Sequence, residues 1–330
     1  HLHFTGSMRH TTVLELAKEQ GVFLPDALTD HWPPDLSAAD EKGWFRFQRL
    51  YDVARSVVDN EAAVRRLVTE AAEDDAAEGS RWLEIQVDPS GYGQHFGGIT
   101  AFLELAIDAA ADATRATGVE VQLVVAANRT RHPMDARTLA RLAAQYAGRG
   151  VVGFGLSNDE RRGEPHAFGK AFEIARRAGL IAAPHSGELL GAESVWSTLR
   201  ELQPDRLGHG VRSAEDPRLV ARIVDAGIPL EVCPRSNVAL GVYPDLASVP
   251  LRMLFDAGAR VAVGADDPLL FGSRLLDQYE AARSSHRFTD EELATLARMS
   301  IDASTAPPDV KLRVSTDIDR WLRQDPVVDR

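Results

Sequence analysis

Between residues 82 and 264 the sequence alternates short apolar runs with longer stretches of helical periodicity, and this alternation limits the fold more than any other feature. The runs are rich in branched aliphatic residues and too short for helices, so they predict buried strands, whereas the stretches between them predict helices. The expected strands are at 82–87, 119–125, 151–156, 180–184, 205–208, 229–232 and 260–264.

An eighth strand is expected at the start of the chain, where His1 and His3 flank Leu2. Because the chain begins with His1 rather than Met, we expect this strand to begin upstream. Eight parallel strands with intervening helices form a (β/α)8 TIM barrel, an α/β fold whose sites lie at the C-terminal ends of the strands. A doubly wound open sheet is the alternative, but the sequence has neither a G-x-G-x-x-G turn nor a Walker loop.

Residues before the second strand are expected to form extra helices. Apolar residues recur at helical spacing over 45–77, whereas 22–43 holds several prolines and tryptophans with little periodicity. We therefore expect a helical insertion at about 8–75 that covers the C-terminal face of the barrel as a lid, with a plain surface loop at 22–43 as the alternative. Helices over 291–322 would close the barrel, and residues 1–330 are expected to form a single domain.

The composition narrows the range of partners. A net charge of -12 weighs against nucleic acid and anionic membranes, because both would repel the protein, and it leaves a small neutral or cationic ligand. No run of about 18 apolar residues predicts a membrane helix. The single cysteine, Cys233, excludes an internal disulfide framework, favours a cytoplasmic location and is expected to be a small buried hydrophobic residue. The oligomeric state is left open.

Four side chains of the kinds that bind metals stand at or beside expected strand ends. His1 and His3 are two residues apart on a strand, so their imidazoles lie on one face. His185 and Asp266 each follow an apolar run. Three imidazoles and a carboxylate suit one divalent ion, Zn2+ first and Fe2+ or another ion second. The alternative is that the two N-terminal histidines are tag residues.

Three further polar residues adjoin this set. Glu188 follows His185 by three residues and can move a proton beside a bound metal; alternatively, it is a loop carboxylate in water. His209 stands between two glycines, which we expect to clear space around a catalytic ring. Asp267 adjoins Asp266, and since adjacent carboxylates repel, we expect one to bind metal and the other substrate. The remaining histidines are expected at the surface: His10, His31, His95, His132, His166 and His286.

In these stretches the chain resembles the adenosine deaminase family of the metal-dependent amidohydrolases. The matching segments occur in the family's order: His1-Leu2-His3 with Gly6-Ser7, His185-Ser186-Gly187-Glu188, Arg206-Leu207-Gly208-His209-Gly210, Leu230 to Asn237, and Asp266-Asp267-Pro268. They are spread over nearly the whole chain and are together highly specific. The zinc deaminases of the cytidine type do not fit, because they require H-x-E with P-C-x-x-C.

The resemblance implies one catalytic metal, usually zinc, held by four residues: His1, His3, His185 and Asp266. It also implies that Glu188 carries a proton to N1 of the purine, that His209 orients or deprotonates the attacking water, and that Asp267 hydrogen-bonds the ring near N7. Protonation at N1 makes C6 electrophilic, water activated by the metal adds there, and ammonia leaves.

Two residues depart from the family pattern and bear on the substrate. Thr5 stands where typical adenosine deaminases have an aspartate that contacts the ribose 5'-hydroxyl, so a 5'-modified adenine nucleoside or free adenine gains weight. Asn158 stands where the family often has a glycine whose backbone N–H meets N3 of the purine. A side chain at this position would crowd the sugar or the edge of the base.

The sequence therefore predicts hydrolytic deamination of adenosine or a related 6-aminopurine nucleoside, with release of ammonia. The alternatives are a deaminase of a 5'-modified adenine nucleoside or of free adenine, an amidohydrolase of another substrate class, and a non-catalytic binding protein. Against the last alternative, every residue needed for proton transfer and metal binding is present.

Overall fold

The computed structural model describes residues 1–324, in which eight strands form one parallel sheet and each strand pairs with the next in sequence. The strands are β1 (Leu2–His3), β2 (Trp82–Val87), β3 (Glu120–Asn128), β4 (Val151–Ser157), β5 (Ile181–Ser186), β6 (Leu207–His209), β7 (Leu230–Val232) and β8 (Val261–Val263). The Asp266 carbonyl accepts from the amide of His3 at 3.0 Å, and its amide donates to the carbonyl of His1 at 2.9 Å. These bonds join β1 to the residues just after β8, so the predicted (β/α)8 barrel is confirmed.

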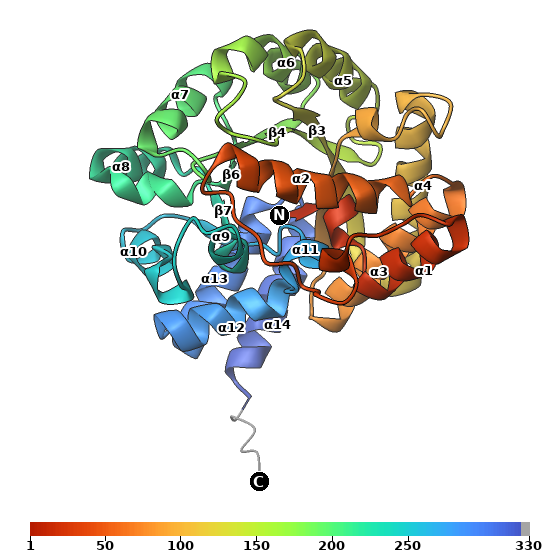
Figure 1. Ribbon diagram of the computed structural model, residues 1–330. Helices are drawn as coiled ribbons and strands as arrows, with labels where there is room; N and C mark the ends of the chain where they lie inside the picture. The colour runs from red at the N-terminus through yellow and green to blue at the C-terminus, as the bar shows by residue number, and fades with distance from the viewer. Residues whose placement is uncertain (325–330) are drawn as a thin grey trace.

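Helices surround this sheet (Figure 1). They are α1 (His10–Gln20), α2 (Glu41–Ser56), α3 (Glu61–Ala77), α4 (Ile99–Thr117), α5 (Pro133–Gln145), α6 (Pro165–Arg177), α7 (Ala192–Leu202), α8 (Pro217–Ala226), α9 (Pro234–Ala239), α10 (Leu251–Asp256), α11 (Pro268–Phe271), α12 (Leu275–His286), α13 (Asp290–Ala303) and α14 (Pro308–Leu322). Among residues 1–324, no helix is long and apolar enough to cross a membrane.

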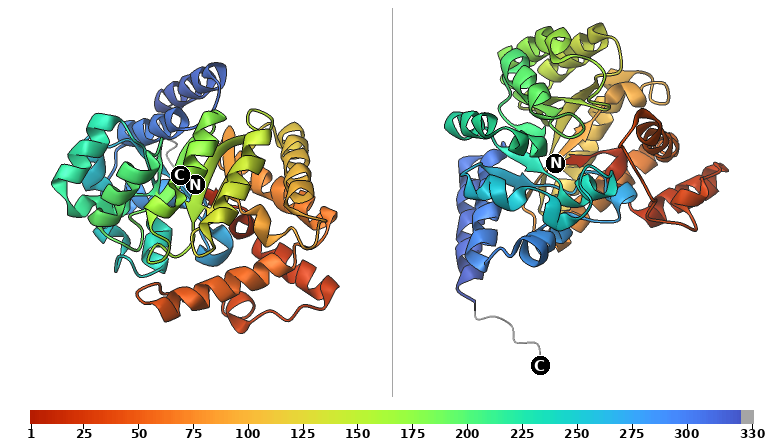
Figure 2. Two further views of the ribbon diagram at one scale, coloured as in Figure 1. Left: turned by 90° about the horizontal axis from the view of Figure 1, so that it is seen from above. Right: turned by 60° about the vertical axis from the view of Figure 1, so that its left-hand side comes forward.

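Helix α2 crosses one end of the barrel, as the views in Figures 1 and 2 show. The helical periodicity expected over 45–77 falls on two helices, α2 and α3. The Asn60 side chain accepts from the amide of Ala63 at 3.0 Å and caps a new helix, α3, while Asp40 caps α2 by accepting from Gly43 at 2.7 Å. Because side chains of Asn and Asp satisfy free amides at helix starts, each one begins a separate helix.

Two strands extend further than the apolar runs predict. The register pairs His185 with Gly208 and Ser186 with His209, so both histidines lie inside strands rather than after them. Backbone pairing continues through these polar residues because parallel strands bond through their main chains whatever the side chain. The two imidazoles therefore stand on a rigid sheet.

The barrel strands and inner helix faces share an apolar core, in which Cys233 is buried as expected. The expectation that the remaining histidines lie at the surface is wrong for His286, which is 7% exposed. His10 also has a defined contact, since its ring stacks on Trp32 at 4.3 Å between centroids. Neither histidine lines the cavity described below.

Candidate active site

A cavity of about 70 Å³ lies at the C-terminal ends of the strands, under α2. Helix α2 contributes five lining side chains: Trp44, Phe47, Gln48, Tyr51 and Arg55. Eight of the nine residues expected from the sequence also line it: His3, Thr5, Asn158, His185, Glu188, His209, Asp266 and Asp267. The ninth, His1, lies beside them, with its ring 5.2 Å from that of His3 and 4.6 Å from that of His185. This is the end of the barrel at which the fold places its sites.

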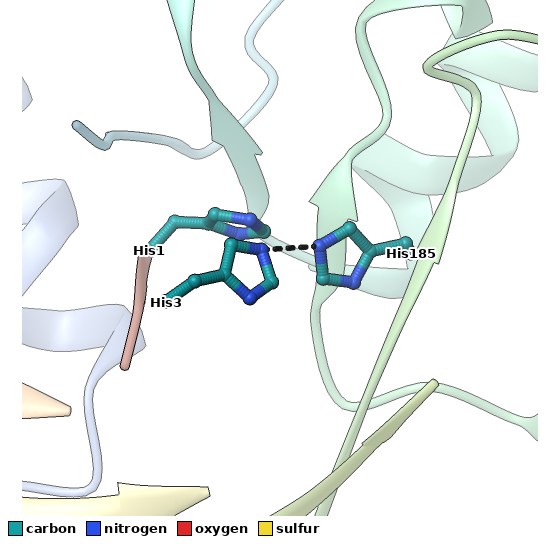
Figure 3. A group of neighbouring side chains, drawn as sticks. All are labelled: His1, His3 and His185. Atoms are coloured by element: carbon teal, nitrogen blue, oxygen red, sulfur yellow. Dashed lines mark hydrogen bonds between the residues drawn. The ribbon is translucent and has the colours of Figure 1, made fainter. Parts of the chain in front are cut away.

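The four expected metal ligands converge on one point. Nε2 of His3 lies 3.1 Å from Nε2 of His185 and 3.3 Å from Oδ1 of Asp266. Nε2 of His1 lies 3.5 Å from the same carboxylate oxygen. Figure 3 shows the three rings, from His1 just before β1, His3 of β1 and His185 of β5, turned toward one another. Ligand atoms of the three histidines all lie within 4.8 Å of one another, which is close enough for one ion to contact them all.

The surroundings of His1 fit a cation at this point. Nδ1 of His1 lies 2.7 Å from Oε2 of Glu231, so Nε2 is the ring nitrogen that faces the point where the expected ligands meet. Burial alone lowers the pKa of His1, but hydrogen bonds with Asp266 and Glu231 outweigh it and raise the pKa to about 10. Positive charge is thus favoured here. A carboxylate behind an imidazole is the usual support for a ligand to zinc.

Asp266, like His1, is held by a neighbouring side chain. The hydroxyl of Ser236 donates to Oδ2 of Asp266 at 2.6 Å, which leaves Oδ1 for the point where the imidazoles meet. Burial acts to raise the pKa of Asp266, but hydrogen bonds from His1 and His3 prevail and hold it well below its usual range. Three imidazoles and an ionised carboxylate are a donor set that suits zinc and similar divalent ions.

Glu188 and His209 are neighbours whose pKa values are shifted in opposite directions. Oε1 of Glu188 lies 3.7 Å from Nε2 of His209, and both side chains are buried. Burial, together with the charges of Asp266 and Glu160, raises the pKa of Glu188 well above its usual value. Burial lowers the pKa of His209 to about 3. Burial therefore favours the protonated form of the carboxyl and the neutral form of the imidazole, which is the arrangement of an acid beside a base.

Asp267 differs from its neighbour. Burial and the negative charge of Asp266 raise the pKa of Asp267 well above its usual value, which favours the protonated carboxyl. Its Oδ1 is buried and has no hydrogen-bond partner among residues 1–324, which leaves it for a ligand. A Cβ atom at Gly6 would lie 1.8 Å from this oxygen. Gly6 is therefore required for Asp267 to occupy its place.

The profile of the family described as adenosine deaminase matches residues 1–321. The chain belongs to the adenosine deaminase family. A Streptomyces virginiae protein named "Putative adenosine/adenine deaminase" is 60% identical over 322 residues, which cover 98% of this chain and 95% of that protein. A Rhizobium meliloti adenine deaminase is 36% identical over 306 residues, 92% of each chain.

Two solved structures are similar to this chain over nearly its whole length. The crystal structure of an adenine deaminase from Arthrobacter aurescens superposes with a TM-score of 0.90 at 30% identity and covers 98% of both chains. A Burkholderia ambifaria amidohydrolase, solved with bound Zn, gives a TM-score of 0.85 at 25% identity and covers 98% of this chain and 90% of that one. This chain thus has closely the same barrel as these two solved structures.

The two departures from the family pattern have defined contacts. The hydroxyl of Thr5 hydrogen-bonds that of Tyr92, whose ring stacks on Phe102 at 4.3 Å between centroids. The Asn158 side chain holds α2: its Oδ1 accepts from Nε1 of Trp44 at 3.3 Å, and its Nδ2 donates to Oε1 of Gln48 at 3.0 Å. In this family member Asn158 therefore fastens the helix over the cavity mouth.

The glycines beside His209 act differently from the expectation. A Cβ atom at Gly208 would lie 3.0 Å from Cε1 of His1 and 3.1 Å from Cγ of His185. The space that Gly208 leaves is therefore occupied by those two rings, and the expectation that it clears room for His209 is wrong. His209 itself has φ +61, a conformation uncommon for residues with a side chain.

Several residues around this family's site escape sequence reasoning. Glu231 and Ser236 lie in a segment that matches the family, yet nothing local shows that they support His1 and Asp266. Glu231 had one signal, a carboxylate in the middle of an apolar strand, where it needs a buried partner. Glu160, discussed below, had none, because its partners lie far along the chain.

Proposed function

We propose that this protein is a hydrolytic deaminase of a 6-aminopurine and that free adenine is its preferred substrate. The observation that carries the choice of adenine is the helix over the cavity: five side chains of α2 line it, and we infer that this cover leaves room for a planar base but not for its ribose. Adenosine and 5'-modified adenine nucleosides remain the alternative substrates.

Two further observations support the free base. The hydroxyl of Thr5 hydrogen-bonds Tyr92 and offers no carboxylate to a ribose 5'-hydroxyl. Asn158 holds α2 over the mouth through Trp44 and Gln48, where a sugar would leave the cavity. Relatives from Rhizobium meliloti and Arthrobacter aurescens are named adenine deaminases.

One divalent metal would be held by His1, His3, His185 and Asp266, and zinc is the first choice because the Burkholderia ambifaria neighbour binds Zn. When bound, such an ion lowers the pKa of a coordinated water and so supplies the nucleophile at neutral pH.

The remaining steps belong to the chain's own residues. Protonated Glu188 donates to N1 of the purine, which makes C6 electrophilic. Neutral His209 accepts a hydrogen bond from the attacking water and orients it toward C6. Protonated Asp267 donates to N7 and fixes the ring in the cavity. Addition of water and loss of ammonia convert adenine into the 6-oxopurine, so atoms balance.

A purine panel tests this proposal. The purified protein is assayed for ammonia release with adenine, adenosine, 2'-deoxyadenosine, 5'-deoxyadenosine and AMP, with its metal content measured in parallel. We expect kcat/KM for adenine to exceed that for adenosine at least tenfold. A higher value for a nucleoside would overturn the choice of the free base, and inactivity of the metal-loaded protein on every compound would overturn the deaminase.

A further inference from the structure

Glu160 is a buried carboxylate outside the cavity, on the loop between β4 and α6, and it is 5% exposed. Its Oε2 accepts from three consecutive backbone amides, those of Glu188 at 3.0 Å, Leu189 at 2.8 Å and Leu190 at 2.9 Å. Its Oε1 accepts from the amide of Gly187 at 2.6 Å. Four successive amides of the segment that carries Glu188 thus point at one side chain.

Two hydroxyls complete the set around Glu160. Oγ of Ser194 donates to Oε1 at 2.6 Å, and Oγ of Ser186 donates to the same oxygen at 3.2 Å. With six donors around it, the carboxyl acts as an acceptor toward every one of these partners. Helix α7 begins nearby with Gly191 at its N-cap and no capping side chain, so Glu160 also satisfies amides that precede this helix.

Arg129 balances this charge and holds the other end of the same segment. The guanidinium is 2% exposed, and its Nη2 donates to the carbonyl of His185 at 2.6 Å. Its Nη1 lies 3.4 Å from the backbone carbonyl of Glu160. The stretch from His185 to Glu188 is therefore held at both ends. Its first carbonyl accepts from Arg129, and its last amide donates to Glu160.

We propose that Glu160 is a positioning residue for the deamination, because it gathers the amides of residues 187–190 and thereby fixes where the Glu188 carboxyl faces the cavity. This inference rests on the proposed function, in which Glu188 is the proton donor. Glu160 does not line the cavity, so it acts through Glu188 rather than on the substrate. Without its charge, four amides lose a common acceptor, and the turn relaxes toward other partners.

The test compares three variants in the metal-loaded protein. Glu160→Gln keeps the shape but replaces one acceptor oxygen by a donor, and we expect kcat on adenine to fall about 10- to 100-fold with KM within about threefold, since a misplacement near 1 Å costs that much. Glu160→Asp keeps the carboxylate on a shorter side chain, and its kcat on adenine should lie between those of Glu160→Gln and the wild type. The matched control is Glu164→Gln, an exposed residue on the same loop, which should behave like wild type.

A purely structural role gives a different result. If Glu160 only stabilises the fold, the Glu160→Gln variant loses melting temperature and metal while kcat per metal-loaded protein stays at the wild-type value. That outcome would overturn the proposal, as would equal kcat in the Glu160→Gln and wild-type proteins at equal metal content.

Hydrogen–deuterium exchange separates this inference from the proposed function. The amides of residues 187–190 should be protected in the wild type and should exchange at least tenfold faster in Glu160→Gln. Faster exchange in a protein that deaminates no purine would mean that the positioning holds and the assigned reaction fails. If Glu160→Gln does not fold, the experiment is done on the wild type alone. Exchange of amides 187–190 at the rate of an unstructured peptide would then refute the positioning.

Discussion

At the scale of single residues, the same carboxyl group takes opposite charge states because its neighbours differ. Asp266 meets histidines and stays ionised, whereas Asp267, one residue later, meets Asp266 and keeps its proton. Glu188 is protonated through burial. Burial acts to raise the pKa of Glu231, but the charge of Arg206 outweighs it and lowers the pKa to about 2. Each group's role thus follows from its partners rather than its type.

Replacement of Glu188 by Gln should stop proton donation to N1 while the metal stays bound. We expect kcat on adenine to fall roughly 1,000-fold, the usual contribution of a positioned acid. Steady-state assays with metal analysis on the same samples measure both quantities. The matched control is Glu193→Gln, an exposed residue of the next helix, which should keep full activity. A Glu188→Gln enzyme with wild-type kcat would remove Glu188 from the reaction.

The pH dependence of kcat should report the same acid. Because burial raises the pKa of Glu188, this carboxyl keeps its proton to a higher pH than an exposed glutamate does. We therefore expect kcat to fall as pH rises through that pKa, since the ionised carboxylate has no proton to donate. Assays between pH 6 and 10 measure it, and a kcat that kept rising to pH 10 would contradict the assignment.

At the scale of elements, α2 is attached to the barrel where the substrate enters. Asn158 makes this attachment from the end of β4, with its backbone at φ +80 and its side chain on Trp44 and Gln48. Since helix α2 supplies one wall of the cavity, we expect the strength of these hydrogen bonds to affect how large a substrate fits. A residue of the barrel thus influences specificity through a lid that it holds in place.

Asn158→Gly removes both bonds and keeps the backbone, because glycine accepts a positive φ. We expect the ratio of kcat/KM for adenosine over adenine to rise about fivefold, the equivalent of one lost hydrogen bond of about 1 kcal/mol. Competition assays with both substrates measure the ratio. Gln203→Gly, which changes a distant residue with φ +48, is the control and should leave it unchanged. An unchanged ratio in Asn158→Gly would mean that these bonds do not set specificity.

At the scale of the whole molecule, the expected metal ligands join segments that are far apart in sequence. His3 belongs to β1 and His1 directly precedes it, His185 belongs to β5, and Asp266 follows β8. An ion bound to all four would therefore tie together opposite parts of the barrel, and its binding energy would add to the stability of the fold.

Metal removal should both inactivate and destabilise the protein. Dialysis against a chelator is expected to abolish ammonia release and to lower the melting temperature by about 5 °C, as the loss of about 3 kcal/mol of ligand binding implies. Calorimetry and activity assays before and after return of Zn2+ measure both effects. If the chelated protein keeps its melting temperature and its activity, these four residues hold no catalytic ion.

The opposite end of the barrel carries a buried ion pair between Glu84 of β2 and Arg206, which also lies 2.6 Å from Glu231. Burial acts to raise the pKa of Glu84, but Arg206 and Thr305 outweigh it and lower the pKa below the ordinary 4.5. A lowered pKa in the folded state means that this group stabilises the fold above about pH 4.5 and stops doing so as the pH falls further.

Glu84→Gln should therefore reduce the free energy of unfolding at pH 7 by about 3 kcal/mol, because it leaves a buried guanidinium with one partner fewer. The difference from wild type should narrow as the pH falls below 4.5, where the wild-type carboxylate takes up its proton. Urea titrations at pH 7 and pH 4 measure this, with exposed Glu280→Gln as the control. A difference independent of pH would contradict the ion-pair account.

The sequence by itself determined the barrel, because eight apolar runs separated by helical patterns leave few other arrangements. It also indicated the chemistry, since a residue that follows a strand in this fold points toward one common mouth. For the same reason His185, Glu188 and Asp266 could be grouped before any contact was known. Boundaries were less accurate, as at Asn60, where one capping side chain divides a helical pattern in two.

Only the tertiary structure decided what Thr5, Asn158 and Glu160 do. Thr5 bonds Tyr92, Asn158 bonds α2, and Glu160 gathers the amides of residues 187–190, in each case across at least 27 residues of sequence. Such contacts depend on which loops meet at the barrel mouth, and the local periodicity of the sequence does not predict which loops meet. The expected metal ligands could be read from strand ends, whereas the residues that hold Glu188 and α2 in place emerged only once the barrel had closed.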